Sequence, residues 1–379
     1  MGACFIAALC TPVRTTSADP HDGTLSLRVQ AVPAVAPSRL PEGPQPIWQR
    51  RVQGAIDIAP AATPNGSLVV LSAGRVSQLS PEGQLEWSVR IRAGTGATTP
   101  VATPSGTVFV TTRGELWRLS SGGRLSVRRK IATRAPSPGT PLVVTHDAHL
   151  ALALGSTLVL LNLDGEVEAE ARLPEPCTAI HRFDRALVLV DQRGGVHRWR
   201  PRVGLTRIGT LGGQARTTPW LGANRLLAIV DGARLVEIDL TTGRRRVRSV
   251  ADGKQYLEYP LVSPDGTSYV LTSEGLLLTI DSRGQERKRS LLRGPAGGGA
   301  LAETRLLLGE KRIAFATPLG DVGVVGMDGT VQRPAAAGCL TPVALTGLGA
   351  ERFVVSCPNG TLMAYGAAEG SGDSPPGAL

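Results

Sequence analysis

A short unit that is repeated along the chain constrains this sequence more than any other feature. Its clearest copy, residues 259–284 with the sequence YPLVSPDGTSYVLTSEGLLLTIDSRG, contains three extended segments separated by turns. The β-branched and aromatic residues of the segments are typical of strands, and Gly, Pro and Asp in the turns favour chain reversal. Copies at residues 60–83 and 100–123 align without a gap at a spacing of 40 residues. A fixed period of this size predicts a repeat architecture.

The glycines of the turns indicate that the unit occurs eight times. The glycine of the second turn recurs as Gly74, Gly114, Gly155, Gly194, Gly232, Gly275, Gly320 and Gly360. The closing glycine follows as Gly83, Gly123, Gly165, Gly204, Gly243, Gly284, Gly329 and Gly370. The opening proline recurs as Pro60, Pro100, Pro141, Pro219, Pro260 and Pro342, with Cys177 near the missing fourth position.

The two ends of the repeat region complement each other. The sequence PEG at residues 41–43 recurs at 81–83, and each copy is soon followed by a tryptophan, Trp48 or Trp87. The N-terminal piece therefore corresponds to a fourth strand without its first three, whereas the last repeat has three strands and lacks the fourth. The sequence predicts an all-β, eight-bladed β-propeller of four-stranded antiparallel blades, whose last blade is closed by the N-terminal strand.

The rest of the chain divides around this propeller, which we place at residues 46–366. Residues 1–18 hold a short apolar run, ACFIAALC, and a small-residue site, Thr16-Ser17-Ala18. This pattern indicates a signal or lipoprotein segment that is truncated at its start, with Cys4 or Cys10 as the candidate lipid carrier, or else it is no signal at all. Residues 19–45 form a Pro-rich tether, and residues 367–379 form a tail without a strand pattern. No stretch approaches the ~18 apolar residues of a membrane span.

The chain carries a formal net charge of +10, which favours anionic neighbours. Basic clusters at residues 124–134, 244–248 and 286–289 each follow a closing glycine, so we expect them on the outermost strands of three blades. One explanation is that their charge prevents edge-to-edge pairing of open strands. The other is a basic rim, centred on Arg244, Arg245 and Arg246, that binds anionic lipid or an acidic polymer. Nucleic acid is not an expected partner, because aromatic residues for base stacking are scarce.

The pattern inside the copies resembles the pyrroloquinoline-quinone-type propeller repeat. The resemblance is carried by Pro260, Asp265-Gly266-Thr267, Gly275-Leu276 and Ile280-Asp281 in one copy, by Pro100, Gly106-Thr107, Gly114-Glu115-Leu116 and Leu119 in another, and by Trp87 and Trp48. It covers about 320 residues and implies a propeller fold rather than an activity. Members of this class include quinoprotein dehydrogenases, which hold the quinone and calcium over the ring axis, and cofactor-free propellers such as the lipoprotein of the outer-membrane barrel-assembly machinery.

The features that the resemblance implies for a dehydrogenase are missing from this sequence. None of the five cysteines is adjacent to another, and the one clear insertion, residues 294–299, is Gly-rich and offers no ligands. Four aspartates recur beside closing turns: Asp164, Asp239, Asp281 and Asp328. A position shared among repeats indicates turn chemistry. We therefore predict no catalytic, cofactor-binding or metal-binding residues and no cofactor.

Three further patterns have structural explanations. His146 and His149 lie in one turn region, where a surface loop is favoured over a metal site. Asn65-Gly66-Ser67 and Asn359-Gly360-Thr361 match the glycosylation pattern but are explained as turns. Cys339 and Cys357 fall on neighbouring strands of the last blade and could form a disulfide in an oxidising compartment.

These observations predict a non-catalytic, extracytoplasmic propeller that acts as a monomeric protein-interaction scaffold at a bacterial cell envelope, in the periplasm, at the outer membrane or at the cell surface. The alternative is a divergent quinoprotein dehydrogenase or a carbohydrate-acting propeller enzyme that uses the axial channel. The regular repeats, which lack ligand-bearing insertions, favour the interaction scaffold.

Overall fold

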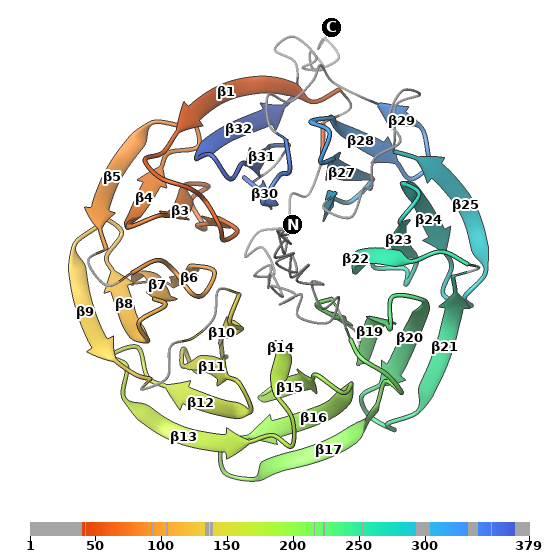
Figure 1. The fold of residues 1–379 in the computed structure, drawn as a ribbon, viewed down its shortest axis with the longest axis horizontal. Helices are drawn as coiled ribbons and strands as arrows, with labels where there is room; N and C mark the ends of the chain where they lie inside the picture. The colour runs from red at the N-terminus through yellow and green to blue at the C-terminus, as the bar shows by residue number, and fades with distance from the viewer. Residues whose placement is uncertain are drawn as a thin grey trace, which may run out of the picture.

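A computed structural model describes residues 40–367, except 42, 92–93, 104, 133–135, 137–138, 216, 223, 252, 293–303, 333–339 and 350. Every regular element of these residues is a strand, and the strands form eight separate four-stranded antiparallel sheets. The sheets are arranged as blades around a central axis (Figure 1). The predicted all-β, eight-bladed propeller is therefore confirmed.

The blades are numbered 1 to 8 in chain order, and each runs from the axis to the perimeter. The innermost strands are β2 (Ala61–Ala62), β6 (Val101–Thr103), β10 (Leu142–Val144), β14 (Cys177–Phe183), β18 (Trp220–Gly222), β22 (Tyr256–Val262), β26 (Arg305–Leu308) and β30 (Ala344–Gly347). The second strands are β3 (Leu68–Ser72), β7 (Gly106–Val110), β11 (Leu150–Leu154), β15 (Ala186–Asp191), β19 (Arg225–Val230), β23 (Ser268–Thr272), β27 (Arg312–Ala316) and β31 (Phe353–Ser356).

The third and fourth strands complete each blade. The third strands are β4 (Arg75–Leu79), β8 (Glu115–Leu119), β12 (Thr157–Leu161), β16 (Gly195–Arg200), β20 (Arg234–Asp239), β24 (Leu276–Ile280), β28 (Val322–Gly326) and β32 (Thr361–Gly366). The outermost strands are β5 (Leu85–Arg90), β9 (Leu125–Lys130), β13 (Val167–Arg172), β17 (Gly204–Thr210), β21 (Arg245–Val250), β25 (Glu286–Leu291), β29 (Val331–Gln332) and, in blade 8, β1 (Gln45–Arg51).

The ring is closed by the N-terminal strand, as predicted. Strand β1 pairs antiparallel with β32, from Gln45 opposite Gly366 to Arg51 opposite Thr361. Blade 8 therefore combines the first strand of the chain with the last three, in the order β1-β32-β31-β30. Because both ends of the repeat region are in one sheet, opening the ring would require the loss of a whole strand pairing.

The core lies between the blades. The second strands are almost continuously apolar, as in LVVLS of β3 and RLLAIV of β19, and their apolar side chains are buried. A short apolar run bounded by turns is the pattern of a strand that is covered on both faces. One cluster of buried side chains joins Val188 and Val190 of blade 4 to Ala228 and Val230 of blade 5. Outermost strands are mostly exposed, so the hydrophobic stabilisation comes from the inner three strands.

Two tryptophans that follow a closing glycine, Trp48 and Trp87, join neighbouring blades. Trp48 of β1 packs against Gly83 of blade 1, where a Cβ would lie 2.6 Å from the indole ring. Its Nε1 donates a hydrogen bond to the carbonyl of Pro81 at 2.9 Å. Trp87 of β5 packs in the same way on Gly123 of blade 2. The closing glycine is thus required both by its turn, where φ is +77° at Gly83, and by this close approach.

Several sequence predictions fall outside the described residues: the signal or lipoprotein segment with Cys4 and Cys10, most of the tether, the insertion at 294–299 and nearly all of the C-terminal tail. The final residues of the tether are described. Leu40 is buried among the side chains of blades 7 and 8, and Arg312 Nη1 donates a hydrogen bond to its carbonyl at 2.6 Å. In the described part of the chain, no helix has the length and apolar character needed to cross a bilayer.

Candidate functional site

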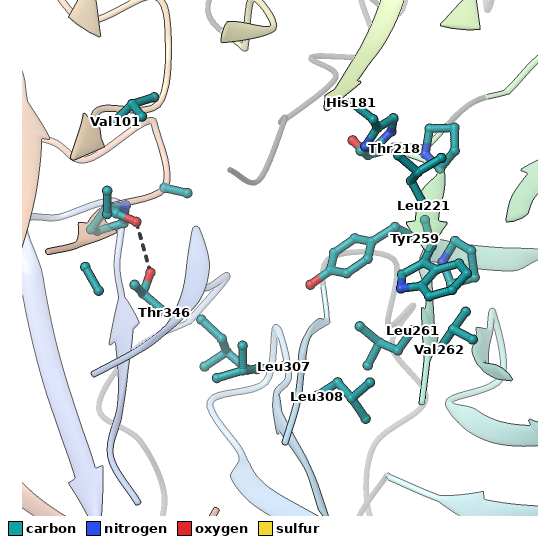
Figure 2. Close-up of a pocket in the computed structure, with 18 of the residues that line it drawn as sticks. Val101, His181, Thr218, Leu221, Tyr259, Leu261, Val262, Leu307, Leu308 and Thr346 are labelled. Atoms are coloured by element: carbon teal, nitrogen blue, oxygen red, sulfur yellow. Dashed lines mark hydrogen bonds between the residues drawn. The ribbon is translucent and has the colours of Figure 1, made fainter. Parts of the chain in front are cut away.

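The ring axis contains a cavity of about 290 Å³. Residues from every innermost strand except β10 lie among its described lining. Figure 2 shows side chains such as Leu261, Leu307 and Thr346 surrounding the opening. Thr346 of blade 8 donates a hydrogen bond to the carbonyl of Pro60 in blade 1 at 3.2 Å, so the closing seam extends to the axis.

The axial cavity is lined mainly by apolar groups. Four opening prolines of the repeat, Pro60, Pro100, Pro219 and Pro260, lie in this lining. A proline has no N–H, so it leaves one fewer unpaired donor on the inner edge of a blade. The repeated proline therefore has a structural role at the axis.

The described lining does not fit the quinone and calcium that the enzymes of this repeat class hold at the axis. It contains no Asp, Glu, Asn or Gln side chain, whereas calcium prefers carboxylate and amide oxygens. Nor do the described residues contain any group of three or more His, Cys, Asp or Glu side chains close enough to hold a metal ion.

His181 is the one ionisable imidazole in this lining, and sequence analysis missed it. It lies on β14 and is 6 % exposed, and its Nε2 has no hydrogen-bond partner among the described residues. Burial lowers the pKa of His181 to about 4, because the charged imidazolium would lose its hydration. The side chain is therefore neutral at physiological pH. No sequence signal identifies it, since a single histidine on an apolar strand is not a motif.

The repeated aspartates serve turns, as predicted, with one exception. Asp239 accepts hydrogen bonds from the amides of Thr241 and Thr242, and Asp281 accepts them from those of Arg283 and Gln285. These backbone hydrogen bonds lower the pKa of both carboxyls.

Asp328 behaves in the same way, because its pKa is lowered by the hydrogen bond from the Thr330 amide. Asp164 is the exception. Asn162 accepts the backbone hydrogen bonds of that turn, and Asp164 forms an ion pair with Arg118 at 3.2 Å. The glycosylation-like sites also serve turns: Asn359 Oδ1 accepts a hydrogen bond from the Thr361 amide, and Asn65 Oδ1 accepts one from the Thr63 hydroxyl.

The three basic clusters lie on outermost strands, as expected, but they differ in how their charges are paired. On β9, Arg128 contacts Glu115 at 3.0 Å, and the guanidinium lowers the pKa of this carboxyl. Arg129 of the same strand contacts Glu166 of blade 3 at 3.1 Å. Two of the basic residues on β9 are thus paired with neighbouring carboxylates.

The cluster at β21 is different, because Arg244, Arg245 and Arg246 are exposed and have no carboxylate partner among the described residues. Arg245 Nη1 donates a hydrogen bond to the carbonyl of Leu211 at 3.4 Å, and Arg246 Nη2 donates one to the carbonyl of Arg283. A carbonyl orients a guanidinium without cancelling its charge.

Arg248 ends the same cluster but has a structural role. Its Nε lies 3.0 Å from Glu237 Oε2, and it donates hydrogen bonds to Ser268 Oγ at 2.9 Å and to the carbonyl of Ser282 at 2.9 Å. It is buried against Gly284, where a Cβ would lie 2.2 Å from the Arg248 carbonyl. Arg248 therefore joins blade 5 to blade 6 and does not belong to an exposed rim.

The cluster at β25 is mostly paired. Arg287 contacts Asp281 at 2.7 Å, and Arg289 contacts Glu286. Lys288 lies along Gly329, close enough to Asp328 for its charge to contribute to the lowered pKa of that carboxyl. Only one of the three clusters in the sequence therefore presents consecutive unneutralised arginines.

A cleft of about 510 Å³ lies between blades 3 and 4, and it contains both histidines of the predicted turn. His149 Nε2 lies 2.8 Å from Glu168 Oε2, whereas His146 is exposed. Exposed arginines lie around the cleft: Arg182, Arg185, Arg200 and Arg202. Val203 at its edge is 70 % exposed. Sequence analysis did not identify this cleft, because its residues come from three separate turns and several strands.

Blade 4 also contains a buried polar pair that the sequence did not reveal. His197 Nε2 lies 2.8 Å from Asp191 Oδ2, and both side chains are buried. Asp191 Oδ1 accepts a hydrogen bond from the Gly195 amide at 2.7 Å. A Cβ on Gly195 would lie 2.3 Å from the carboxylate, so this glycine provides the space for the pair.

The described cysteines show no reactive thiol. Cys177 is free, its thiol donates to the carbonyl of Ala179 at 3.3 Å, and burial raises its pKa to about 12. Cys357 is buried and disulfide-bonded. Its expected partner, Cys339, lies outside the described residues, so that pairing stays a prediction.

Comparison with known proteins identifies the family to which this chain belongs. A family profile described as "Outer membrane protein assembly factor BamB" matches residues 38–290. A search of curated proteins found no match.

Among solved structures, BamB from Moraxella catarrhalis aligns with a TM-score of 0.67 at 16 % identity, covering 85 % of this chain and 99 % of that one. The computationally designed Ika8 protein aligns with a TM-score of 0.69 at 16 % identity, again over 85 % and 99 %. The C-terminal WD40 domain of Sif2 aligns with a TM-score of 0.67 at 12 % identity, over 86 % and 99 %.

At these identities the three structures support the fold alone, whereas the profile covers more than half of the chain. The resemblance to the cofactor-free members of the quinone-type repeat class is confirmed: the chain belongs to the family of outer membrane protein assembly factor BamB.

Proposed function

We propose that this protein is a non-catalytic β-propeller that binds protein partners outside the cytoplasm, in association with the cell envelope. The composition of the axial cavity carries this proposal. Enzymes of the repeat class place their cofactor at the axis, and here the described lining offers mainly apolar side chains, with Thr218, Thr346, Tyr259 and one neutral histidine as its polar groups besides the indole of Trp220. Such a lining supplies neither carboxylate nor side-chain amide oxygens for calcium, and no carboxylate base.

Membership of the BamB family supports protein partners, since the family is described as an outer membrane protein assembly factor. The cleft between blades 3 and 4 is a suitable contact region. It combines exposed arginines with the exposed Val203, and interfaces of protein complexes are enriched in arginine and contain apolar contacts. The turns of this cleft also differ from those of the other repeats, which is where a repeat protein acquires specificity.

Site-specific photo-crosslinking in cells tests the proposal. A photoreactive amino acid replaces Arg202 at the cleft in the full chain, and a matched variant carries it at the exposed Glu170 of β13. We expect a defined protein to crosslink at position 202 and not at position 170, and to be recovered with an extracytoplasmic fraction. A chain found only in the cytosol, or equal capture at both positions, would contradict the proposal.

The enzymatic alternative has its own measurement. The purified chain is titrated with pyrroloquinoline quinone and calcium while the absorbance of the quinone is followed. The non-catalytic proposal predicts no saturable spectral change, and a stoichiometric shift would overturn it.

A further inference from the structure

We propose that five arginines on the perimeter of blades 4 to 6 form a binding surface for the phosphate groups of an anionic phospholipid bilayer. These residues, Arg207, Arg244, Arg245, Arg246 and Arg283, are called the arginine belt below. All five are exposed. The inference goes beyond the proposed binding of protein partners and does not depend on it.

The belt is continuous across three blades, although its residues are far apart in sequence. A Cβ on Gly243, next to Arg244, would lie 2.4 Å from the carbonyl of Ile208, so the closing turn of blade 5 touches β17 beside Arg207. At the other end, Arg246 donates a hydrogen bond to the carbonyl of Arg283 in the closing turn of blade 6. Figure 1 shows β17, β21 and β25 following one another along the perimeter.

The charges of the belt are oriented but not neutralised. Within the described residues, none of the five guanidinium groups has a carboxylate at ion-pair distance. The turn carboxylate of blade 5, Asp239, accepts hydrogen bonds from the amides of Thr241 and Thr242. Arg245 bonds a carbonyl of blade 4, and Arg246 bonds one of blade 6. Less side-chain entropy is then lost when the belt binds an anion.

The outermost strand β9 shows that this arrangement is not a general property of the ring. It has three consecutive basic residues, Arg128, Arg129 and Lys130, but two of them form ion pairs with Glu115 and Glu166. If charge served only to prevent edge pairing of outer strands, β9 and β21 would have no reason to differ. Among the described residues, three consecutive exposed arginines without an ion pair occur at residues 244–246.

A bilayer fits this surface better than a soluble acidic polymer does. Val247 lies on β21 directly beside the belt and is 40 % exposed, and Val250 at the end of the same strand is 62 % exposed. Apolar side chains next to arginines gain free energy at the boundary between headgroups and acyl chains, whereas a hydrated polymer offers them no apolar environment. Guanidinium groups bind phosphate oxygens in a bidentate geometry.

Vesicle binding by the purified full chain tests the inference. Two kinds of vesicle are compared at low and high salt: phosphatidylcholine with about 30 % phosphatidylglycerol, and phosphatidylcholine alone. We expect binding to the anionic vesicles only, and loss of binding at high salt because the charges are exposed and screened.

Two triple variants with the same change in net charge separate the belt from total charge. Each arginine near an anionic surface contributes about fivefold, so Arg244→Ser, Arg245→Ser and Arg246→Ser together should weaken binding about a hundredfold. The matched control, Arg128→Ser, Arg129→Ser and Lys130→Ser on β9, should change it less than about threefold, because this strand belongs to blade 2, outside the belt, and two of its three charges are paired with carboxylates.

A second belt variant tests whether a loss of vesicle binding could result from misfolding. Arg207→Ser, Arg244→Ser and Arg283→Ser remove three side chains for which the structure gives no side-chain hydrogen bond within the described residues, so folding should be retained while binding falls by a similar factor. The inference is overturned if the unaltered chain ignores anionic vesicles at low salt, or if the belt and β9 variants lose binding equally. It is also overturned if soluble polyphosphate competes at equal phosphate concentration as strongly as vesicles, since the surface would then recognise a polymer.

Discussion

Two seams between blades pack on a closing glycine with opposite chemistry. Between blades 8 and 1, Trp48 follows its glycine, Gly43, by five residues and covers Gly83 with an indole ring. Between blades 5 and 6, the main-chain carbonyl of Arg248 lies against Gly284, and the Arg248 side chain donates to residues of blade 6. The first seam is apolar with one hydrogen bond from the indole, and the second relies on an ion pair and several hydrogen bonds.

The comparison shows what the repeat requires and what it leaves open. The closing glycine is required at both seams, because any Cβ would meet the preceding blade. The group that lies on this glycine differs, because it is an indole ring at Gly83 and a main-chain carbonyl at Gly284. A buried arginine can bridge the second seam because Nη1 and Nη2 donate to Ser268 and Ser282, and Nε lies 3.0 Å from the carboxylate of Glu237 without forming a hydrogen bond. Removal of Trp48 should therefore lower the free energy of unfolding through lost packing. Removal of Arg248 should lower it through lost ion-pair and hydrogen-bond partners.

The largest effect is expected at the apolar seam. Trp48→Ala should lower the free energy of unfolding by about 4 kcal/mol, because a buried aromatic side chain is lost and a cavity remains. Urea unfolding monitored by circular dichroism measures this loss. As a control, Trp48→Phe keeps most of the packing and loses the bond to the Pro81 carbonyl, so about 1 to 2 kcal/mol is expected. Equal losses in the two variants would show that packing on Gly83 does not hold the seam.

A smaller loss in the free energy of unfolding is expected at the polar seam, and a second substitution should restore most of it. Arg248→Ala leaves the partly buried Glu237 without its near partner and should cost about 2 to 3 kcal/mol, since Glu237 keeps Arg225 at 3.7 Å. Arg248→Met combined with Glu237→Gln removes both charges while retaining volume. This pair should recover most of the loss in the same urea measurement, whereas no recovery would mean that the hydrogen bonds of the guanidinium matter more than its charge.

The smallest effect is a difference in acid sensitivity between the two closing turns. Asp281 stabilises the turn that holds Gly284, and hydrogen bonds from backbone amides lower its pKa below the usual 3.8. A carboxyl with a lowered pKa in the folded state stabilises the turn above about pH 4 and loses that contribution as the pH falls through the folded value. In the turn that holds Gly83, the side-chain acceptor is the hydroxyl of Ser80, which does not titrate.

Hydrogen exchange followed by mass spectrometry can detect this difference. Protection factors, corrected for the intrinsic pH dependence of exchange, should fall in residues 281–285 between pH 5 and pH 3 and stay constant in residues 80–84. Asp281→Ser should make the two turns alike. Parallel behaviour of the unaltered turns would contradict the assignment of Asp281 to the turn.

Much of the fold could be predicted from the sequence because the repeat carries local information. Glycine and proline mark turns through their backbone preferences alone, and apolar runs between them mark buried strands. Closure by β1 followed from the complementary ends of the repeat region. The outermost position of the basic clusters followed from their place after a closing glycine.

The candidate site was less predictable, because its properties depend on contacts between blades. The sequence shows three basic clusters of similar composition, but only the structure separates Arg128, which is paired, from Arg246, which is not. The structure also shows that Arg248 is buried and does not belong to the exposed arginines. Glu166, which neutralises Arg129, belongs to another blade.

The sequence by itself therefore determined the number of repeats, the four strands of each blade and the closure of the ring, since these depend on short-range backbone preferences and on periodicity. The tertiary structure alone decided which charges remain unpaired, that His181 is buried beside an apolar cavity, and that Arg248 is buried at the seam between blades 5 and 6. The physical reason is that burial and ion pairing depend on distances between side chains in different blades, and a repeated sequence pattern does not encode those distances.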